Sequence, residues 1–191
     1  MSMDFNDAES NTGDLIPKGT VAPVVMVVRP GKAGDGGWLT QSSSSLYRYM
    51  DCEFTVSEGP YRNRKFWSNI MVDHDSPSEE RVAKTLGISR SKLRGILESA
   101  RGIKPDDESD DAKAKRKVDG YGDFSGIEFV AKIGVQIGSG QYSDKNELDS
   151  AVPITSKQHP KNGGSVDTSA KGSTNAPNDG AQSGGVPKWA A

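Results

Sequence analysis

Residues 46–72, LYRYMDCEFTVSEGPYRNRKFWSNIMV, decide the fold that the sequence predicts. Within 48–56 the residues alternate with the two-residue period of a strand, which gives one apolar face, made of Cys52, Phe54 and Val56. Residues 58–61 include a glycine and a proline, which favour a turn, and we expect a second strand over 62–72. The stretch therefore predicts a β-hairpin with one buried face and one face in water.

Basic and aromatic side chains gather around this turn, and six of the chain's 13 aromatic residues fall within 46–72. The candidate binding residues here are Tyr47, Arg48, Tyr49, Tyr61, Arg62, Arg64, Lys65 and Trp67. Cationic groups pair with phosphates and rings stack on unpaired bases, with about 1–3 kcal/mol for each stacked base. The same residue types also suit the soluble edge of an ordinary strand pair. The pattern leaves both interpretations open, and Trp67 is the better stacking candidate because its face also carries Lys65.

The composition limits the class of protein. A chain of 191 residues is long enough for one packed domain, while a hydrophobic content of 33% predicts that part of it is disordered. The single cysteine excludes a disulfide framework and a cysteine metal cluster, and we expect no metal and no cofactor. The acidic N-terminus is unlike a secretory signal, and no apolar run reaches the length of a membrane span. These features predict a cytoplasmic protein without a membrane partner.

Charge is distributed unevenly along the chain, although its net value is only −2. Residues 1–17 carry four acidic residues and no Lys or Arg, and residues 105–111 carry five more acidic residues. Residues 18–104 hold 14 Lys and Arg against nine Asp and Glu. The sequence therefore predicts a basic body with acidic extensions, a distribution that favours a polyanionic partner.

The rest of the chain completes a fold that is mainly β. The β-branched run 21–29 predicts a strand, a glycine-rich loop follows it, and Trp38 then either stacks on a base or closes over the core. Residues 76–104 start with helix-capping signals and predict a helix, and alternation over 127–137 predicts a strand with a return strand over 142–152.

The resulting order is three strands, a helix and two strands. It matches a five-stranded OB-fold-like barrel with one or two helices, in which the helix lies between strands 3 and 4 and the face of strands 2 and 3 binds oligonucleotides. We assign residues 1–17 to an acidic arm, 18–153 to this domain, and 154–191 to a disordered tail rich in Gly and Ser.

Residues 79–101 allow a second interpretation as a helix-turn-helix motif. Gly87 then occupies the turn, and Ser89 caps a recognition helix whose exposed basic residues are Arg90, Lys92 and Arg94. Such a protein reads duplex DNA rather than single strands.

Several segments carry a resemblance to a known group of proteins. They are KGTVAPVVMVVRPG, CEFTVSEGPYRNRKFWSNI, LRGILESARGIKPDD, FSGIEFVAKI and YSDKN, and the similarity extends from about residue 18 to residue 152. The chain resembles an uncharacterised family of phage and prophage proteins that are encoded among replication and recombination genes. That family is similar in outline to phage single-stranded DNA-binding proteins with an OB-fold.

The resemblance implies sequence-tolerant binding of single-stranded DNA, with phage replication or recombination proteins as possible partners in the host cytoplasm. In its light the helix-turn-helix match is accidental. The chain departs from single-strand binders in its last residues, because 156–191 carry four Lys against two Asp where an acidic tail is usual.

Three functions remain open from the sequence: a single-stranded DNA-binding protein, a helix-turn-helix regulator, and an adaptor or structural protein without nucleic-acid binding. We do not expect an enzyme, because the chain has two His and one Cys and lacks a phosphate-binding loop. The oligomeric state is open, and a dimer is compatible with the sequence.

Overall fold

The computed structural model describes residues 14–163 and consists mainly of an antiparallel β-sheet with two α-helices. The strands are β1 (Val21–Arg29), β2 (Thr40–Gln41), β3 (Tyr47–Val56), β4 (Lys65–His74), β5 (Glu128–Gln136) and β6 (Lys145–Ala151). The helices are α1 (Glu80–Arg101) and α2 (Asp110–Lys115), with 3-10 turns at η1 (Asp35–Gly37), η2 (Tyr121–Phe124) and η3 (Pro160–Asn162). The prediction of a mainly β fold with a helix after the third long strand is confirmed. The predicted count of five strands is wrong because it omits β2, which has only two residues.

The sheet is organised around β3. Along one edge β3 pairs with β4, and along the other it pairs with β2 near its start and with β1 over the rest of its length. The sheet continues from β1 to β5 and from β5 to β6. Every pairing is antiparallel, so the two strands at the ends of this series, β4 and β6, run in the same direction.

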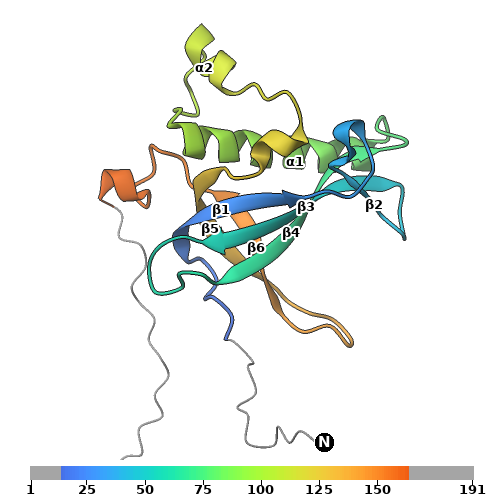
Figure 1. Ribbon diagram of the computed structural model, residues 1–191, viewed down its shortest axis with the longest axis horizontal. Helices are drawn as coiled ribbons and strands as arrows, with labels where there is room; N and C mark the ends of the chain where they lie inside the picture. Colours follow the sequence, from blue (N-terminus) through green and yellow to red (C-terminus); the bar gives the residue numbers. More distant parts are fainter. Residues whose placement is uncertain (1–13, 164–191) are drawn as a thin grey trace, which may run out of the picture.

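The sheet is not closed into a barrel. A single hydrogen bond crosses from the Leu148 N–H of β6 to the Ser68 Oγ of β4, at 2.8 Å, where a closed barrel would have a ladder of backbone bonds. Figure 1 shows α1 lying across the sheet and the β5–β6 hairpin projecting away from the body. In the part of the chain that the structure describes, neither helix is both long and apolar enough to cross a bilayer.

The core lies between the sheet and α1. Cys52, Phe54 and Val56 are fully buried, which confirms the face predicted from their alternation. The Phe54 ring stacks on Phe66 with centroids 5.1 Å apart and meets Phe129 edge-on at 6.1 Å. The apolar stripe of α1 completes this core through Leu93, Ile96 and Leu97. Burial raises the pKa of the Cys52 thiol to about 12, so this side chain is a neutral core group.

Packed residues lie on both sides of the predicted domain, outside residues 18–153. Ile16 belongs to the core at 1% exposure, because its N–H and C=O both bond to the Asn146 side chain. The chain beyond residue 153 continues into η3, and His159 is 3% exposed. Ile16, from the predicted arm, and His159, from the predicted tail, are therefore packed residues. The remainder of both predictions, residues 1–13 and 164–191, lies outside the described residues.

The hairpin turn is longer than expected. Gly59 has the positive φ predicted for it, at 84°, and Asn63 also has a positive φ of 68°. The Asn63 N–H donates to the Val56 carbonyl at 2.8 Å and closes the loop. As a result β4 begins at Lys65 instead of Arg62, so that Arg62 and Arg64 belong to the turn.

Candidate nucleic-acid interface

A groove runs along the opening between β4 and β6. It consists of three adjoining hollows, and Lys145 lines all of them. The middle hollow, of about 290 Å³, is lined by Trp67, Met71, Lys92 and Glu147, among others. One end, of about 210 Å³, includes Leu15, Arg64 and Lys65. The third hollow, of about 220 Å³, is lined only by residues 136–145 of the β5–β6 hairpin, among them Ile137 and Tyr142, and it adjoins the opening without a residue of β4. We call this surface the seam groove.

Trp67 stands on the wall of the seam groove with 44% of its surface exposed. Its indole Nε1 donates to Glu53 Oε2 at 3.3 Å, and the same carboxylate accepts from Lys65 Nζ at 2.6 Å through Oε1. The Lys65 ammonium is the main reason that the pKa of Glu53 lies below its usual range. Glu53 therefore stays ionised near neutral pH and orients Trp67 beside a cation.

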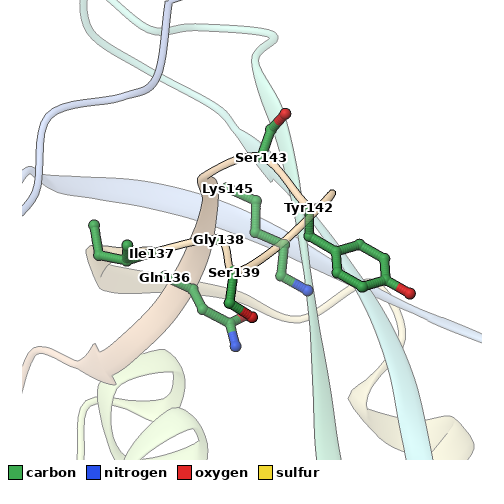
Figure 2. A pocket seen from close by; sticks show the side chains of 7 residues that line it. All are labelled: Gln136, Ile137, Gly138, Ser139, Tyr142, Ser143 and Lys145. Atoms are coloured by element: carbon green, nitrogen blue, oxygen red, sulfur yellow. The ribbon is translucent and has the colours of Figure 1, made fainter.

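The β5–β6 hairpin supplies a second aromatic. Tyr142 and Ile137 are each 73% exposed, and Figure 2 shows them extending from the loop in different directions. The loop is tight at Gly138, where an added Cβ would lie 2.0 Å from the Tyr142 carbonyl oxygen. The Gly138 N–H donates to Asp144 Oδ1 at 2.8 Å, which holds the turn. The hairpin thus displays a phenol ring beside Lys145, which begins β6.

The basic side chains of the groove differ in how far they are engaged. Lys92 Nζ donates to the Leu148 carbonyl at 2.9 Å, and the guanidinium of Arg64 donates to the Asp14 carbonyl. Carbonyl partners leave the positive charge uncompensated, unlike the carboxylate that pairs with Lys65. Lys145 makes no ion pair within the described residues and is exposed. The four basic residues that line these hollows, Arg64, Lys65, Lys92 and Lys145, therefore outnumber the two acidic ones, Asp144 and Glu147.

Other predicted residues lie away from the groove or face a different environment. Arg48 forms ion pairs with Asp73 and Asp75, each at 2.6 Å, and its carboxylate partners raise its pKa. Tyr47 packs edge-on against His74, with ring centroids 4.4 Å apart. Two carboxylates thus neutralise Arg48 near the start of β3, away from the seam groove.

The three remaining predicted residues around the hairpin differ in their burial. Tyr49 is half-buried and lies opposite Met71 in the pairing of β3 with β4. Because Met71 lines the groove, the Tyr49 ring lies beside the groove. Tyr61 packs against the core as a partly buried residue, and Arg62 is exposed at the tip of the turn.

Trp38 closes over the core, which is one of the two placements that the sequence left open. It is half-buried and packs against the core, and its indole lies on Gly122, where an added Cβ would meet Trp38 Cε2 at 2.4 Å. Trp38 is therefore a packing residue, and it does not line the hollows of the seam groove.

The turn predicted within the helix-turn-helix motif is not formed, because α1 is one continuous helix through Gly87 and Ser89. Its three predicted contact residues also point to different surroundings. Arg90 is exposed, Lys92 reaches into the seam groove, and Arg94 pairs with Glu98 at 2.7 Å and Glu108 at 3.1 Å. No common base-reading face is formed by these residues.

Three residues of the site, Lys145, Tyr142 and Ile137, are not among those predicted from the sequence. They became part of the site only because the strand order brings the β5–β6 hairpin next to β4. A signal for them exists in the sequence, since large side chains flank the Gly138–Gly140 turn where small polar residues are usual.

Comparison with known proteins adds no assignment. No protein-family model matches the chain, and no curated protein matches it. Within residues 14–163, no three His, Cys, Asp or Glu side chains gather as the ligands of a metal ion would.

Proposed function

We propose that this protein binds single-stranded DNA with little sequence preference and that the strand lies in the seam groove. The observation that carries the proposal is Trp67, an exposed indole held beside Lys65 and Lys145 on the wall of an open groove. An exposed ring offers a stacking surface to any unpaired base, while duplex bases are already stacked on each other. The ring therefore favours a single strand over a duplex.

The strand order supports an OB-fold-like barrel that is open at one junction. The order β4, β3, β1, β5, β6, with α1 between β4 and β5, is that of a five-stranded Greek-key barrel whose last junction joins two parallel strands. Ser68 and Lys92 bridge this junction through the backbone of Leu148. In such barrels the oligonucleotide crosses the second and third strands and the adjoining loops, and these correspond here to β3, β4 and the β5–β6 hairpin.

The resemblance to phage and prophage proteins encoded among replication and recombination genes gives the proposed role its context. Replication and recombination both expose single strands that need a sequence-tolerant binder. The protein would act there in a host cytoplasm, beside replication or recombination proteins as partners.

A fluorescence titration with a thymidine oligomer of about 30 nucleotides, against its duplex form, tests the proposal. We expect the single strand to quench tryptophan fluorescence more strongly than the duplex does, and salt to weaken the binding. Trp67→Ala should remove most of the quenching and weaken affinity about 5- to 150-fold, because one stacked base contributes about 1–3 kcal/mol.

The matched controls separate the groove from the rest of the surface. Lys145→Gln should lower the salt slope by about 0.7, the value for one phosphate contact on a single strand. Lys113→Gln, an exposed change on α2, should leave the slope unchanged. Binding that is insensitive to Trp67 and Lys145 would place the site elsewhere, and absence of binding to either form of DNA would leave an adaptor protein.

A further inference from the structure

The N-terminal segment enters the fold through the seam groove. The Asn146 side chain accepts from the Ile16 N–H at 2.9 Å and donates to the Ile16 carbonyl at 2.7 Å. An amide that bonds both backbone groups of one residue imitates a strand neighbour, so Ile16 is fixed at the opening between β4 and β6.

The residues just before Ile16 lie on the groove itself. Leu15 lines the end hollow together with Arg64, Lys65, Trp67 and Lys145, and it is 39% exposed. The Arg64 guanidinium donates to the Asp14 carbonyl oxygen. Asp14, the first residue that the structure describes, therefore lies at the proposed DNA site, next to the side chains that would hold a strand.

The composition of this preceding segment matches that site. Residues 1–13 contain Asp4, Asp7 and Glu9 without any Lys or Arg, and Phe5 stands between the first two. Carboxylates around an aromatic ring offer the same two features as a single strand, namely negative charges and a flat stacking face. Glu9 is five residues from Asp14, a span of at most about 17 Å in an extended chain, which is short enough to keep these carboxylates close to the groove.

We propose that residues 1–13 of the same chain occupy the seam groove when no nucleic acid is bound, and that a single strand must displace them. Displacement by a single strand rests on the proposed function, whereas occupancy of the groove by residues 1–13 does not depend on DNA binding. The arm and the DNA strand compete for the same cations. The apparent affinity for DNA is therefore the intrinsic affinity multiplied by the fraction of molecules in which the groove is free.

The test uses the full chain with Asp4→Asn, Phe5→Ala, Asp7→Asn and Glu9→Gln combined. A control removes three exposed acidic residues elsewhere, through Asp106→Asn, Asp110→Asn and Asp119→Asn. In ¹H–¹⁵N spectra without DNA, the Trp67 indole N–H signal, assigned with Trp67→Phe, should shift in the arm variant and stay in place in the control. DNA titration of the arm variant should show about tenfold tighter binding at low salt, the gain expected if the arm occupies about nine-tenths of the grooves. The gain should vanish at high salt.

The two readouts separate the failure of the inference from the failure of the proposed function. An unmoved Trp67 signal in the arm variant overturns occupancy by the arm, whatever the DNA affinity. A moved signal with no binding of DNA to either protein supports occupancy and overturns the proposed function. A shift that depends on protein concentration overturns the intramolecular arrangement, because the arm of a second copy would then fill the groove.

Discussion

The ammonium of Lys92 donates a hydrogen bond to the Leu148 carbonyl oxygen at 2.9 Å and thereby joins α1 to the free edge of β6. The N–H of Leu148 donates to Ser68 Oγ, and Leu148 is only 1% exposed. Buried backbone groups need partners, and in a closed sheet a neighbouring strand would supply them. Here two side chains supply them, which leaves space for a groove between β4 and β6.

Lys92→Met should lower the free energy of unfolding by about 1 kcal/mol, the usual net value of one hydrogen bond. Ser68→Ala should cost about 1–3 kcal/mol, because it leaves a buried N–H without a partner. Arg90→Met changes an exposed position on the same helix and should stay within about 0.5 kcal/mol of the original protein. Urea denaturation measures all three, and equal losses for Lys92→Met and Arg90→Met would show that the seam does not depend on this bond.

Gly122→Ala should displace Trp38, because the new Cβ would lie 2.4 Å from the indole Cε2. Overpacking of this kind costs about 1–3 kcal/mol. Gly120→Ala is the matched control, since its Cβ would meet nothing within 4 Å. The measurements are the unfolding midpoint and the emission maximum of tryptophan, which should move to longer wavelength only in Gly122→Ala. Identical behaviour of both variants would mean that Trp38 moves aside without cost.

The sequence predicted local features of this protein well and the groove poorly. Burial of Phe54 follows from alternation within one strand, and that pattern needs no knowledge of other segments. The groove needs β4 and β6 to meet, and the contact between Ser68 and Leu148 joins residues 80 positions apart. Arg48 shows the same limit, because its ion pairs with Asp73 and Asp75 depend on a register shift between Arg48 and Tyr49. A basic residue in a strand therefore cannot be assigned to phosphate or to an acidic neighbour before the pairing is known.

Arg48→Gln should leave the salt slope of single-strand binding unchanged, although the sequence alone nominated Arg48 as a phosphate contact. Two carboxylates already compensate the charge of Arg48, so Arg48 does not neutralise a DNA phosphate. Its removal therefore leaves the number of counterions released on binding unchanged. Lys145→Gln is the comparison, with an expected fall of about 0.7 in the slope. Affinities measured between 50 and 300 mM salt, about the usual range for such slopes, give both values. A lower slope in Arg48→Gln would mean that DNA breaks these ion pairs on binding.

His159 should make stability depend on pH below about 6.5, the pKa of histidine in an unfolded chain. Burial lowers its pKa in the folded protein, and its Nε2 has no hydrogen-bond partner within residues 14–163. Between the lowered pKa and 6.5 the unfolded chain binds a proton that the folded protein does not, so stability falls as pH falls, by at most about 1.4 kcal/mol per pH unit. His159→Asn keeps an acceptor for the Lys161 N–H but cannot titrate, so it should flatten this part of the profile. Urea midpoints at pH 7.5, 6.5 and 5.5, about one unit apart around that pKa, measure the difference, and parallel profiles would show that His159 is protonated in the fold as readily as in the unfolded chain.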